Sequence, residues 1–213
     1  MFDRSQPKDH GNKQIKFLLR QVLLPRIEPK VALDLFAGRG EISARLYSAF
    51  REIHCVEQNP RSFAFLEERL EGVENPQVHL HRGDNLNFIS EQVAGIADIN
   101  LVDFDAYGSP NPQVKAFFQH YRVSEPMLIF ATDGGKLARL RGRLWHPDWY
   151  STREPEGPAA PRYNHTVVQN YELLIRQFWR ELGRVYSFRI QIFKLVWKAR
   201  KGVAYYGILL APL

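Results

Sequence analysis

Two carboxylates and an aromatic ring stand close together in the segment Asn100-Leu-Val-Asp-Phe-Asp-Ala-Tyr-Gly-Ser-Pro110. The apolar residues before them predict a buried strand, and strand alternation places Asp103 and Asp105 on the same side. A carboxylate can accept a proton from an amine, and Tyr107 offers a flat surface for an extruded base. Methylation of an exocyclic amine of a base requires both of these features. A helix cap followed by a proline-marked turn is the alternative interpretation.

A candidate cofactor site lies earlier, in Val31-Ala-Leu-Asp-Leu-Phe-Ala-Gly-Arg-Gly40. This stretch predicts a buried strand, a glycine turn and a helix that begins near Glu41, which suits the polar end of a nucleotide-like cofactor. A nicotinamide fingerprint needs a third glycine, but Ser43 stands in its place. Carboxylates at the first three expected strands favour S-adenosylmethionine (SAM) instead. The predicted cofactor contacts are Asp34, Phe36, Gly38, Gly40, Glu57, Gln58, Asp84 and Asn85.

Each of the three carboxylates has a task in this hypothesis. Asp34 would hold the amino acid end of SAM, directly or through water. Glu57 would accept both ribose hydroxyl protons, a task common to NAD and SAM sites, and Asp84 would accept from the adenine amine. The alternatives are that Asp34 satisfies loop amides, that Glu57 caps the next helix and that Asp84 lies in a plain turn. Ligands bind at the carboxyl edge of such sheets, so three carboxylates there favour one shared crevice.

Strand and helix signals alternate along the chain, which predicts a parallel sheet with helices on both faces. Strands are expected at Val31–Phe36, Glu52–Glu57, Val78–Arg82, Ile99–Phe104 and Met127–Thr132. Helices are expected at Glu41–Phe50, Pro60–Leu70, Leu86–Val93, Pro112–Tyr121 and Thr166–Glu181. Val185–Trp197 and Val203–Leu210 then predict an antiparallel hairpin. The predicted fold class is α/β, a Rossmann-like, mostly parallel seven-stranded sheet that resembles the class I SAM-dependent methyltransferase fold.

The predicted organisation is an N-terminal helical extension over 1–29 and one methyltransferase domain over 30–213. The apolar face of the N-terminal helix is expected to contain Ile15, Leu18, Leu19 and Val22. Residues 134–164 are rich in Gly, Pro, Arg and aromatics, which predicts a basic aromatic lid. Its cations and flat rings suit phosphates and unstacked bases, and the predicted substrate contacts are Arg139, Arg141, Arg143 and Trp145. A loop that packs its own aromatics is the alternative.

The composition limits which binding partners and which cellular location are expected. The 213 residues are 45% hydrophobic and 24% charged, as in a soluble globular domain. No apolar run has membrane-spanning length and no signal-peptide core opens the chain, so we expect a cytoplasmic protein without a membrane partner. Residues 133–201 carry 14 Lys and Arg against 6 Asp and Glu, although the whole chain has a net charge of only +6. This local excess favours a nucleic acid partner.

Cysteine and histidine usage predicts no metal site. Cys55 is the only cysteine, which excludes an internal disulfide and a cysteine-based zinc site. His79 and His81 alternate on one face of an expected strand, but no third ligand stands at a helpful spacing along the chain. The oligomeric state is not indicated by the sequence.

The segment Asp103-Phe-Asp-Ala-Tyr-Gly-Ser-Pro110 resembles the Asp-x-Asp-Pro-(Phe/Tyr)-Gly-(Ser/Thr)-Pro motif of tRNA guanine-N2 dimethyltransferases. The Thr132-Asp133 pair and the segments Tyr171–Arg176 and Arg184–Lys194 are similar to later parts of that family's core. The resemblance therefore extends over about Val31–Leu210. It is tight at the fourth strand and loose elsewhere.

This resemblance implies roles for individual residues. Asp105 would act on the guanine amine with support from Asp103, and Tyr107 would stack on the base. The chain departs from the motif at Ala106, where the family has the proline that makes a rigid turn. It also stops after the core, where members of the family usually carry an additional domain that helps to grip tRNA.

A second resemblance concerns the start of the chain. His10-Gly-Asn-Lys13, followed by Asp34-Leu-Phe-Ala-Gly38, is similar to the start of adenine-N6 DNA methyltransferases, which implies that Lys13 approaches the SAM carboxylate. Those enzymes use Asp-Pro-Pro-Tyr, which Asp105-Ala-Tyr-Gly108 matches poorly. The leading hypothesis is SAM-dependent methylation of an exocyclic amine of a tRNA guanosine. DNA adenine methylation and a nucleic-acid-binding module without catalysis are the alternatives.

Overall fold

The structure is a computed structural model that describes residues 13–73, 76–140, 147–151, 169–198 and 202–213. The strands are β1 (Val31–Asp34), β2 (Glu52–Glu57), β3 (Gln77–Arg82), β4 (Ile99–Phe104), β5 (Met127–Asp133), β6 (Phe188–Trp197) and β7 (Ala204–Pro212). The α-helices are α1 (Lys13–Leu23), α2 (Glu41–Leu46), α3 (Pro60–Leu70), α4 (Asn85–Gln92), α5 (Asn111–His120), α6 (Gly135–Leu140) and α8 (Tyr171–Tyr186). Short 3₁₀ turns lie at Leu24–Arg26, Val93–Gly95 and Pro147–Tyr150.

The seven strands form one sheet in the order β3-β2-β1-β4-β5-β7-β6. The first five strands are parallel, and β7 lies antiparallel between β5 and β6. This confirms the predicted fold class, including the C-terminal antiparallel hairpin. The strand order reverses between β1 and β4, and in open α/β sheets the carboxyl ends of strands at such a point form the usual ligand site.

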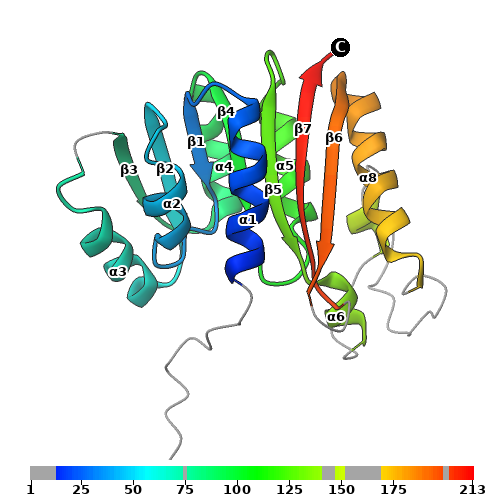
Figure 1. Ribbon diagram of the computed structural model, residues 1–213, viewed down its shortest axis with the longest axis horizontal. Coiled ribbons are helices and arrows are strands. Elements are labelled where there is room, and N and C mark those ends of the chain that lie inside the picture. Colours follow the sequence, from blue (N-terminus) through cyan, green and yellow to red (C-terminus); the bar gives the residue numbers. More distant parts are fainter. Residues whose placement is uncertain (1–12, 74–75, 141–146, 152–168, 199–201) are drawn as a thin grey trace, which may run out of the picture.

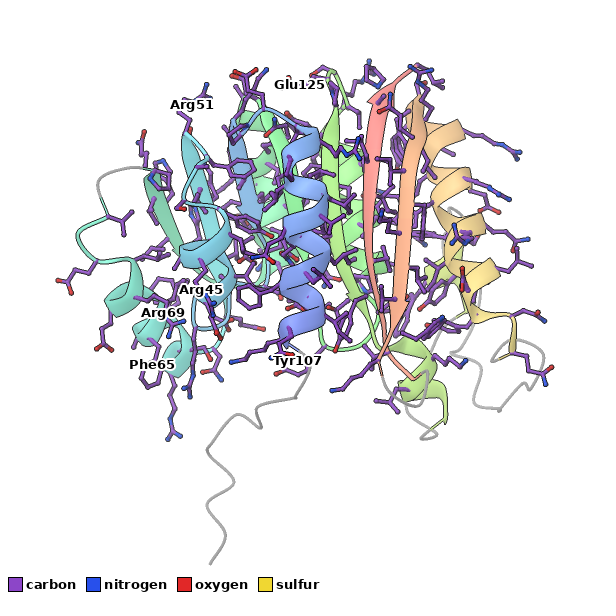
Figure 2. The ribbon with its side chains drawn as sticks, viewed as in Figure 1. Arg45, Arg51, Phe65, Arg69, Tyr107 and Glu125 are labelled. Atoms are coloured by element: carbon purple, nitrogen blue, oxygen red, sulfur yellow. The ribbon has the colours of Figure 1, made fainter. Side chains whose placement is uncertain are left out.

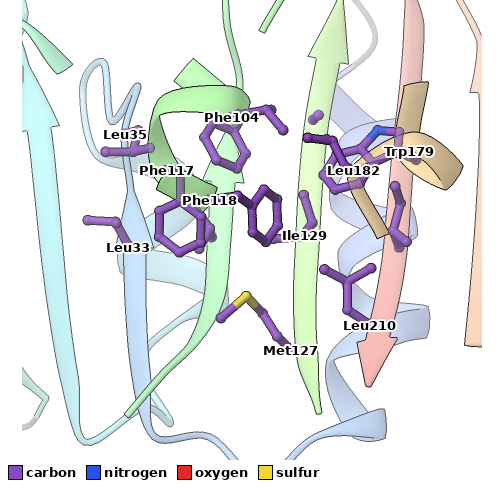
Figure 3. Close-up of a cluster of buried hydrophobic side chains, with 14 of the residues drawn as sticks. Leu33, Leu35, Phe104, Phe117, Phe118, Met127, Ile129, Trp179, Leu182 and Leu210 are labelled. Atoms are coloured by element: carbon purple, nitrogen blue, oxygen red, sulfur yellow. The ribbon is translucent and has the colours of Figure 1, made fainter. Parts of the chain in front are cut away.

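Helices cover both faces of the sheet (Figure 1). Helices α1, α2 and α3 lie in front of it, and α4, α5 and α8 lie behind it. Because both faces are covered, the central strands are apolar on both sides: every residue of β1, β4 and β5 is buried. The core behind the sheet joins strand residues such as Leu33 and Ile129 to Phe117, Phe118 and Trp179 of α5 and α8 (Figure 3). Among the described residues, no helix is long and apolar enough to cross a membrane.

Local sequence signals explain where several elements begin. The Asn59 side chain caps α3 by accepting hydrogen bonds from the backbone amides of Arg61 and Ser62, and Pro60 occupies the first helical position. Asp84 caps α4 in the same way. The first five strands lie within two residues of their predicted bounds.

Three sequence-based predictions about helices were wrong in part. The helix that was expected to end at Glu181 continues to Tyr186. Helix α2 ends at Leu46 and not at Phe50, because the chain turns at Tyr47, whose side chain is fully buried beneath the helix. In α1, Leu18 and Val22 are 61% and 45% exposed, and Arg20 is buried in their place. The face of α1 that contacts the sheet is therefore set by a charged residue as well as by apolar ones.

Candidate active site

The glycine turn connects β1 to α2 at the carboxyl edge of the sheet. Gly38 and Gly40 have φ values of 58° and 72°, in the left-handed region that favours glycine. The Gly38 amide donates a 2.9 Å hydrogen bond to Glu57 Oε2 at the end of β2. A Cβ on Gly40 would lie 2.6 Å from Leu66 Cδ1, so α3 packs directly on the turn. The glycines therefore allow both the backbone conformation and the close approach of α3.

Asp34 lies beneath this turn and not at its surface. Only 2% of the residue is exposed. Its carboxylate accepts hydrogen bonds from the Ser43 hydroxyl and from the Phe36 amide. Burial and the nearby negative charge of Asp103 raise the pKa of Asp34 to about 7. The structure thus leaves Asp34 little surface for direct contact with a ligand, because the Ser43 hydroxyl of α2 bonds to its carboxylate, and a contact through water stays a prediction.

The other predicted cofactor residues surround the turn. Glu57 is half-buried, and its second oxygen accepts a hydrogen bond from the Asn59 amide. Asp84 Oδ1 caps α4, and the Asn85 side chain donates a 2.8 Å hydrogen bond to the Leu35 carbonyl. Gln58 is exposed, and Phe36 is half-buried against the core behind the sheet. Glu57 and the Asp84-Asn85 pair thus lie at the ends of β2 and β3, beside the turn that follows β1.

Asp103 forms a buried ion pair with α1. Arg20 Nε and Nη2 lie 2.8 and 2.7 Å from the two Asp103 oxygens, and the Tyr47 hydroxyl also donates to this carboxylate. The side chains of Arg20 and Asp103 are 2% and 0% exposed. A bidentate pair with an added hydroxyl donor satisfies a carboxylate that burial alone would destabilise. Asp103 therefore anchors α1 to β4 and is closed to any substrate.

Asp105 follows β4 and makes a second ion pair with the same helix. Lys16 Nζ lies 2.5 and 2.7 Å from its two oxygens, and the Thr132 hydroxyl of β5 donates to the first of them. Burial alone would raise the pKa of Asp105, but the charges of Lys16 and Arg20 and these hydrogen bonds outweigh it and lower the pKa. Asp105 is thus an ionised carboxylate held in one orientation. Its side chain is 16% exposed, so it retains access to solvent.

Tyr107 is the most exposed large apolar side chain among the described residues, at 87%. It projects from the carboxyl edge of the sheet, at the end where α1 begins (Figure 2). Two backbone hydrogen bonds hold the turn around Tyr107. The Ala106 amide donates a 2.8 Å hydrogen bond to the Phe104 carbonyl, and the Gly134 amide donates one of 2.6 Å to Gly108. Proline at position 106 would lack the first of these donors.

Asp133, the last residue of β5, accepts hydrogen bonds from a cluster of tyrosine hydroxyls. Its carboxylate is fully buried and accepts hydrogen bonds from the hydroxyls of Tyr150 and Tyr171 and from the Gly135 amide. Burial raises the pKa of Asp133 to about 6. The cluster joins the segment after β5 to the start of α8. Of the predicted lid residues, Arg141, Arg143 and Trp145 lie outside the described residues, and only the backbone of Arg139, within α6, is described.

Lys13 stands at the first residue of α1, next to the start of α2. Its ammonium lies 2.7 Å from Glu41 Oε2, and its side chain is 53% exposed. The helix that contains it therefore begins near α2, which follows the glycine turn. A contact between Lys13 and a cofactor stays a prediction.

Sequence reasoning missed the two cations of α1. Lys16 and Arg20 are four residues apart, so they share one face of the helix, and Asp103 and Asp105 are two apart, so they share one side of the strand. The matched spacing of two cations and two acids was the available signal.

Comparisons with known proteins identify the fold. No family model matches the sequence, and no curated protein matches it. Among solved structures, TYW2 of M. jannaschii in complex with AdoMet is 13% identical with a TM-score of 0.56, covering 97% of this chain and 80% of that one. The chain has the class I methyltransferase fold.

Two further structures support that assignment. Trm1 of Pyrococcus horikoshii in complex with S-adenosyl-L-methionine is 14% identical with a TM-score of 0.62, covering 94% of this chain and 56% of that one. The tRNA m1G37 methyltransferase of M. jannaschii is 11% identical with a TM-score of 0.53, covering 91% of this chain and 48% of that one. The chain thus spans about half the length of these two proteins. At such identities the likeness is one of fold, so activity must be argued from the site.

Proposed function

We propose that this chain is a SAM-dependent methyltransferase that acts on an exocyclic amine of a nucleic-acid base, that of a tRNA guanosine. The observation that carries the proposal is the position of Asp105 and Tyr107 directly after β4. This strand pairs with β1, which leads into the glycine turn, so an oriented carboxylate and an exposed ring adjoin the expected cofactor site. Structural neighbours that contain AdoMet or S-adenosyl-L-methionine, and one named as a tRNA methyltransferase, support the same conclusion.

The residues around the glycine turn fit SAM. A Cβ on Gly38 would meet only the Phe36 carbonyl, at 3.9 Å, so the space above this glycine is open. Glu57 offers a half-buried carboxylate suited to ribose hydroxyls, and Asp84 and Asn85 offer acceptors and donors for adenine. In this proposal Asp34 acts through Ser43, by fixing the start of α2, and makes no direct contact. When bound, SAM would supply a methyl group on a positively charged sulfur.

Asp105 would orient the target amine and receive its proton. Its ionised carboxylate can accept a hydrogen bond from an amine N–H, which points the nitrogen lone pair away from the carboxylate. Because Lys16 and Thr132 hold the carboxylate, little orientation remains to be fixed when substrate binds. A carboxylate with a lowered pKa is a weak base, so the proton would pass on to water. Asp103 would act only as a positioning residue, through its pair with Arg20.

An aromatic and cationic edge supports a nucleic acid substrate. Figure 2 shows Tyr107, Phe65, Arg45 and Arg69 along the lower edge of the molecule. Phe65 is 45% exposed, and the guanidinium of Arg39 lies 4.3 Å from its ring centre. Exposed rings beside cations bind unstacked bases and phosphates together. This surface comes from α2, α3 and the turn after β4, and it is independent of the predicted lid.

The decisive experiment measures transfer of radiolabelled methyl from SAM to bulk tRNA and to duplex DNA. We expect label in tRNA but not in duplex DNA, and we expect Asp105→Asn to abolish it. Asp98→Asn is the matched control, because Asp98 is exposed and has a φ of 59°, which Asn tolerates. Full activity of the Asp105→Asn variant would contradict the proposed role.

Other results of the same experiment would favour the alternative functions. Label in duplex DNA alone would favour the adenine-N6 enzyme, for which the position of Lys13 beside Glu41 is the supporting contact. SAM binding by calorimetry without label in either polymer would favour a nucleic-acid-binding module that lacks catalysis. If the protein neither binds SAM nor transfers a methyl group, all the functions proposed here that depend on the cofactor are refuted.

A further inference from the structure

Three histidines and a glutamate gather on one face of the two strands at the left edge of the sheet in Figure 1. Glu52 and His54 belong to β2, and His79 and His81 belong to β3. The strands pair in parallel with His54 opposite His79, so alternation brings all four side chains to the face that α4 covers. The rings of His54 and His79 are stacked, with centres 4.5 Å apart.

The distances within this group are those of metal ligands. Glu52 Oε1 lies 2.8 Å from His54 Nε2 and 3.1 Å from His79 Nε2. The three potential ligand atoms all lie within 4.8 Å of one another. Two ligands of a tetrahedral Zn²⁺, each about 2.0–2.2 Å from the metal, lie roughly 3.3–3.6 Å apart. The protein atoms therefore need only small shifts to enclose one ion.

Two details point to a missing partner between these atoms. His79 Nε2 is buried, and no well-aligned hydrogen bond to it exists among the described residues, although Glu52 lies close by. His54 Nδ1 lies 3.1 Å from His81 Nε2. If Nδ1 carries the His54 proton and donates it to His81, the lone pair of His54 Nε2 faces the Glu52 carboxylate. A cation at that point would be bound by both the His54 Nε2 lone pair and the Glu52 carboxylate. A hydrogen bond from the ring nitrogen that does not bind the metal usually orients a metal-bound imidazole.

We propose that Glu52, His54 and His79 bind a divalent transition-metal ion, with Zn²⁺ as the natural occupant, and that His81 holds the His54 ring in position. Two imidazole nitrogens and one carboxylate oxygen form a ligand set that Zn²⁺ accepts, with water completing the coordination. The set lacks the six or more oxygens that Ca²⁺ takes and the oxygen-rich octahedron that Mg²⁺ demands. The partly exposed side chains of His79 and Glu52 leave a route for the ion and its water.

The position of the site indicates a structural task. Strand β3 is an edge strand, held to the sheet only by β2 among the described strands. An ion shared by Glu52, His54 and His79 would join these two strands. Glu52 is the first residue of β2, whereas Glu57 at the glycine turn is the last. Metal binding is therefore independent of methyl transfer, and either proposal can fail without the other.

The test uses Co²⁺ as a spectroscopic probe and Zn²⁺ as its competitor, added to chain that has been freed of metal by a chelator. We expect one Co²⁺ per chain, with the intense visible absorption of a low-coordinate site, and displacement of Co²⁺ by Zn²⁺. The His79→Gln variant should bind Co²⁺ at least about tenfold more weakly. Gln retains a donor for Glu52, so the metal-free variant should unfold at the same temperature as the wild type. Glu52→Gln provides a second variant with the same expected loss.

His120→Gln is the matched control, because His120 is an exposed histidine at the end of α5. It should bind Co²⁺ as tightly as the wild type does. Zn²⁺ should also raise the unfolding temperature of the wild type and of this control, but not that of the His79→Gln variant. The proposal is overturned if Co²⁺ does not bind, if His79→Gln binds it as tightly as the wild type, or if His120→Gln loses it to the same extent.

Discussion

Replacing Lys16 with Met tests whether α1 sets the charge state of the proposed catalytic carboxylate. Met keeps most of the apolar stem but removes the ammonium that lies 2.5 and 2.7 Å from the Asp105 oxygens. The side chains of Lys16 and Asp105 are 21% and 16% exposed, so the pair lies between a surface pair and a fully buried one. Exposed pairs contribute about 0–1 kcal/mol, and breaking a fully buried pair costs about 3–5 kcal/mol.

An intermediate value of about 2 kcal/mol is therefore expected, and the pKa of Asp105 should rise because the neighbouring positive charge is removed. Because the wild-type pKa is lowered by folding, the Asp105 pair stabilises the native state above the unfolded pKa of about 4. That contribution is lost as the pH falls through the folded-state pKa. The stability difference between wild type and variant should consequently be largest at neutral pH and should shrink below about pH 4.

Urea unfolding followed by tryptophan fluorescence at several pH values measures this difference. Lys13→Met is the matched control: its ammonium also pairs with a carboxylate at 2.7 Å, but 53% of the Lys13 side chain is exposed. The control should change the free energy of unfolding by less than about 0.5 kcal/mol. A Lys16→Met effect that is independent of pH, or no larger than that of the control, would refute the argument that Lys16 holds Asp105 ionised.

Three more predictions follow from single residues. Burial raises the pKa of Asp34 to about 7, so the contribution of Asp34 to the free energy of unfolding should fall by about 1.4 kcal/mol per pH unit as the pH rises from 4 towards 7. In urea titrations the pH profile of Asp34→Asn should lack this part of the wild-type slope, and parallel profiles would contradict the prediction. Tyr107→Ala should leave stability within about 0.5 kcal/mol but weaken nucleic acid binding by about 1–3 kcal/mol in titrations, whereas Tyr107→Phe should bind normally. Gly40→Ala should be about 1–3 kcal/mol more destabilising than Gly72→Ala by urea unfolding, because both glycines have a φ of 72° but only Gly40 packs against Leu66.

The parallel sheet was predictable because each strand carries its own signal. The runs over β2 and β4 contain buried apolar residues and are followed by polar or turn-forming residues, and their predicted bounds match the structure. The extent of α2 was not predictable in this way. Residues 47–50 continue a pattern that is compatible with a helix, but burial of Tyr47 against Asp103 ends it. Tertiary contacts outweighed local propensity there.

The chemistry was predictable only where the residues that act together are close in sequence. Asp103, Asp105 and Tyr107 lie within five positions, and strand alternation relates them. The Glu52, His54 and His79 group joins neighbouring strands, and its assembly depends on a register that pairs His54 with His79. No spacing along the chain encodes that register. The partners of Asp103 and Asp105 in α1 lie more than eighty positions away, and only the matched spacing of the two cations and the two acids relates them in the sequence.

Charge balance explains why the helix before the sheet belongs to the site. Asp103 and Asp105 lie near enough to Asp34 to raise its pKa, and α1 supplies two cations, Lys16 and Arg20, to this group. Arg20 and Lys16 offset Asp103 and Asp105, and the third carboxylate has no cation of its own. Burial raises the pKa of Asp34 to about 7, with the charge of Asp103 adding to the effect, and burial also raises the pKa of Asp103. A ligand with net positive charge above the glycine turn would favour the ionised form of Asp34. SAM is such a ligand and the nicotinamide dinucleotides are not, so electrostatics and the absence of a third glycine select the same cofactor.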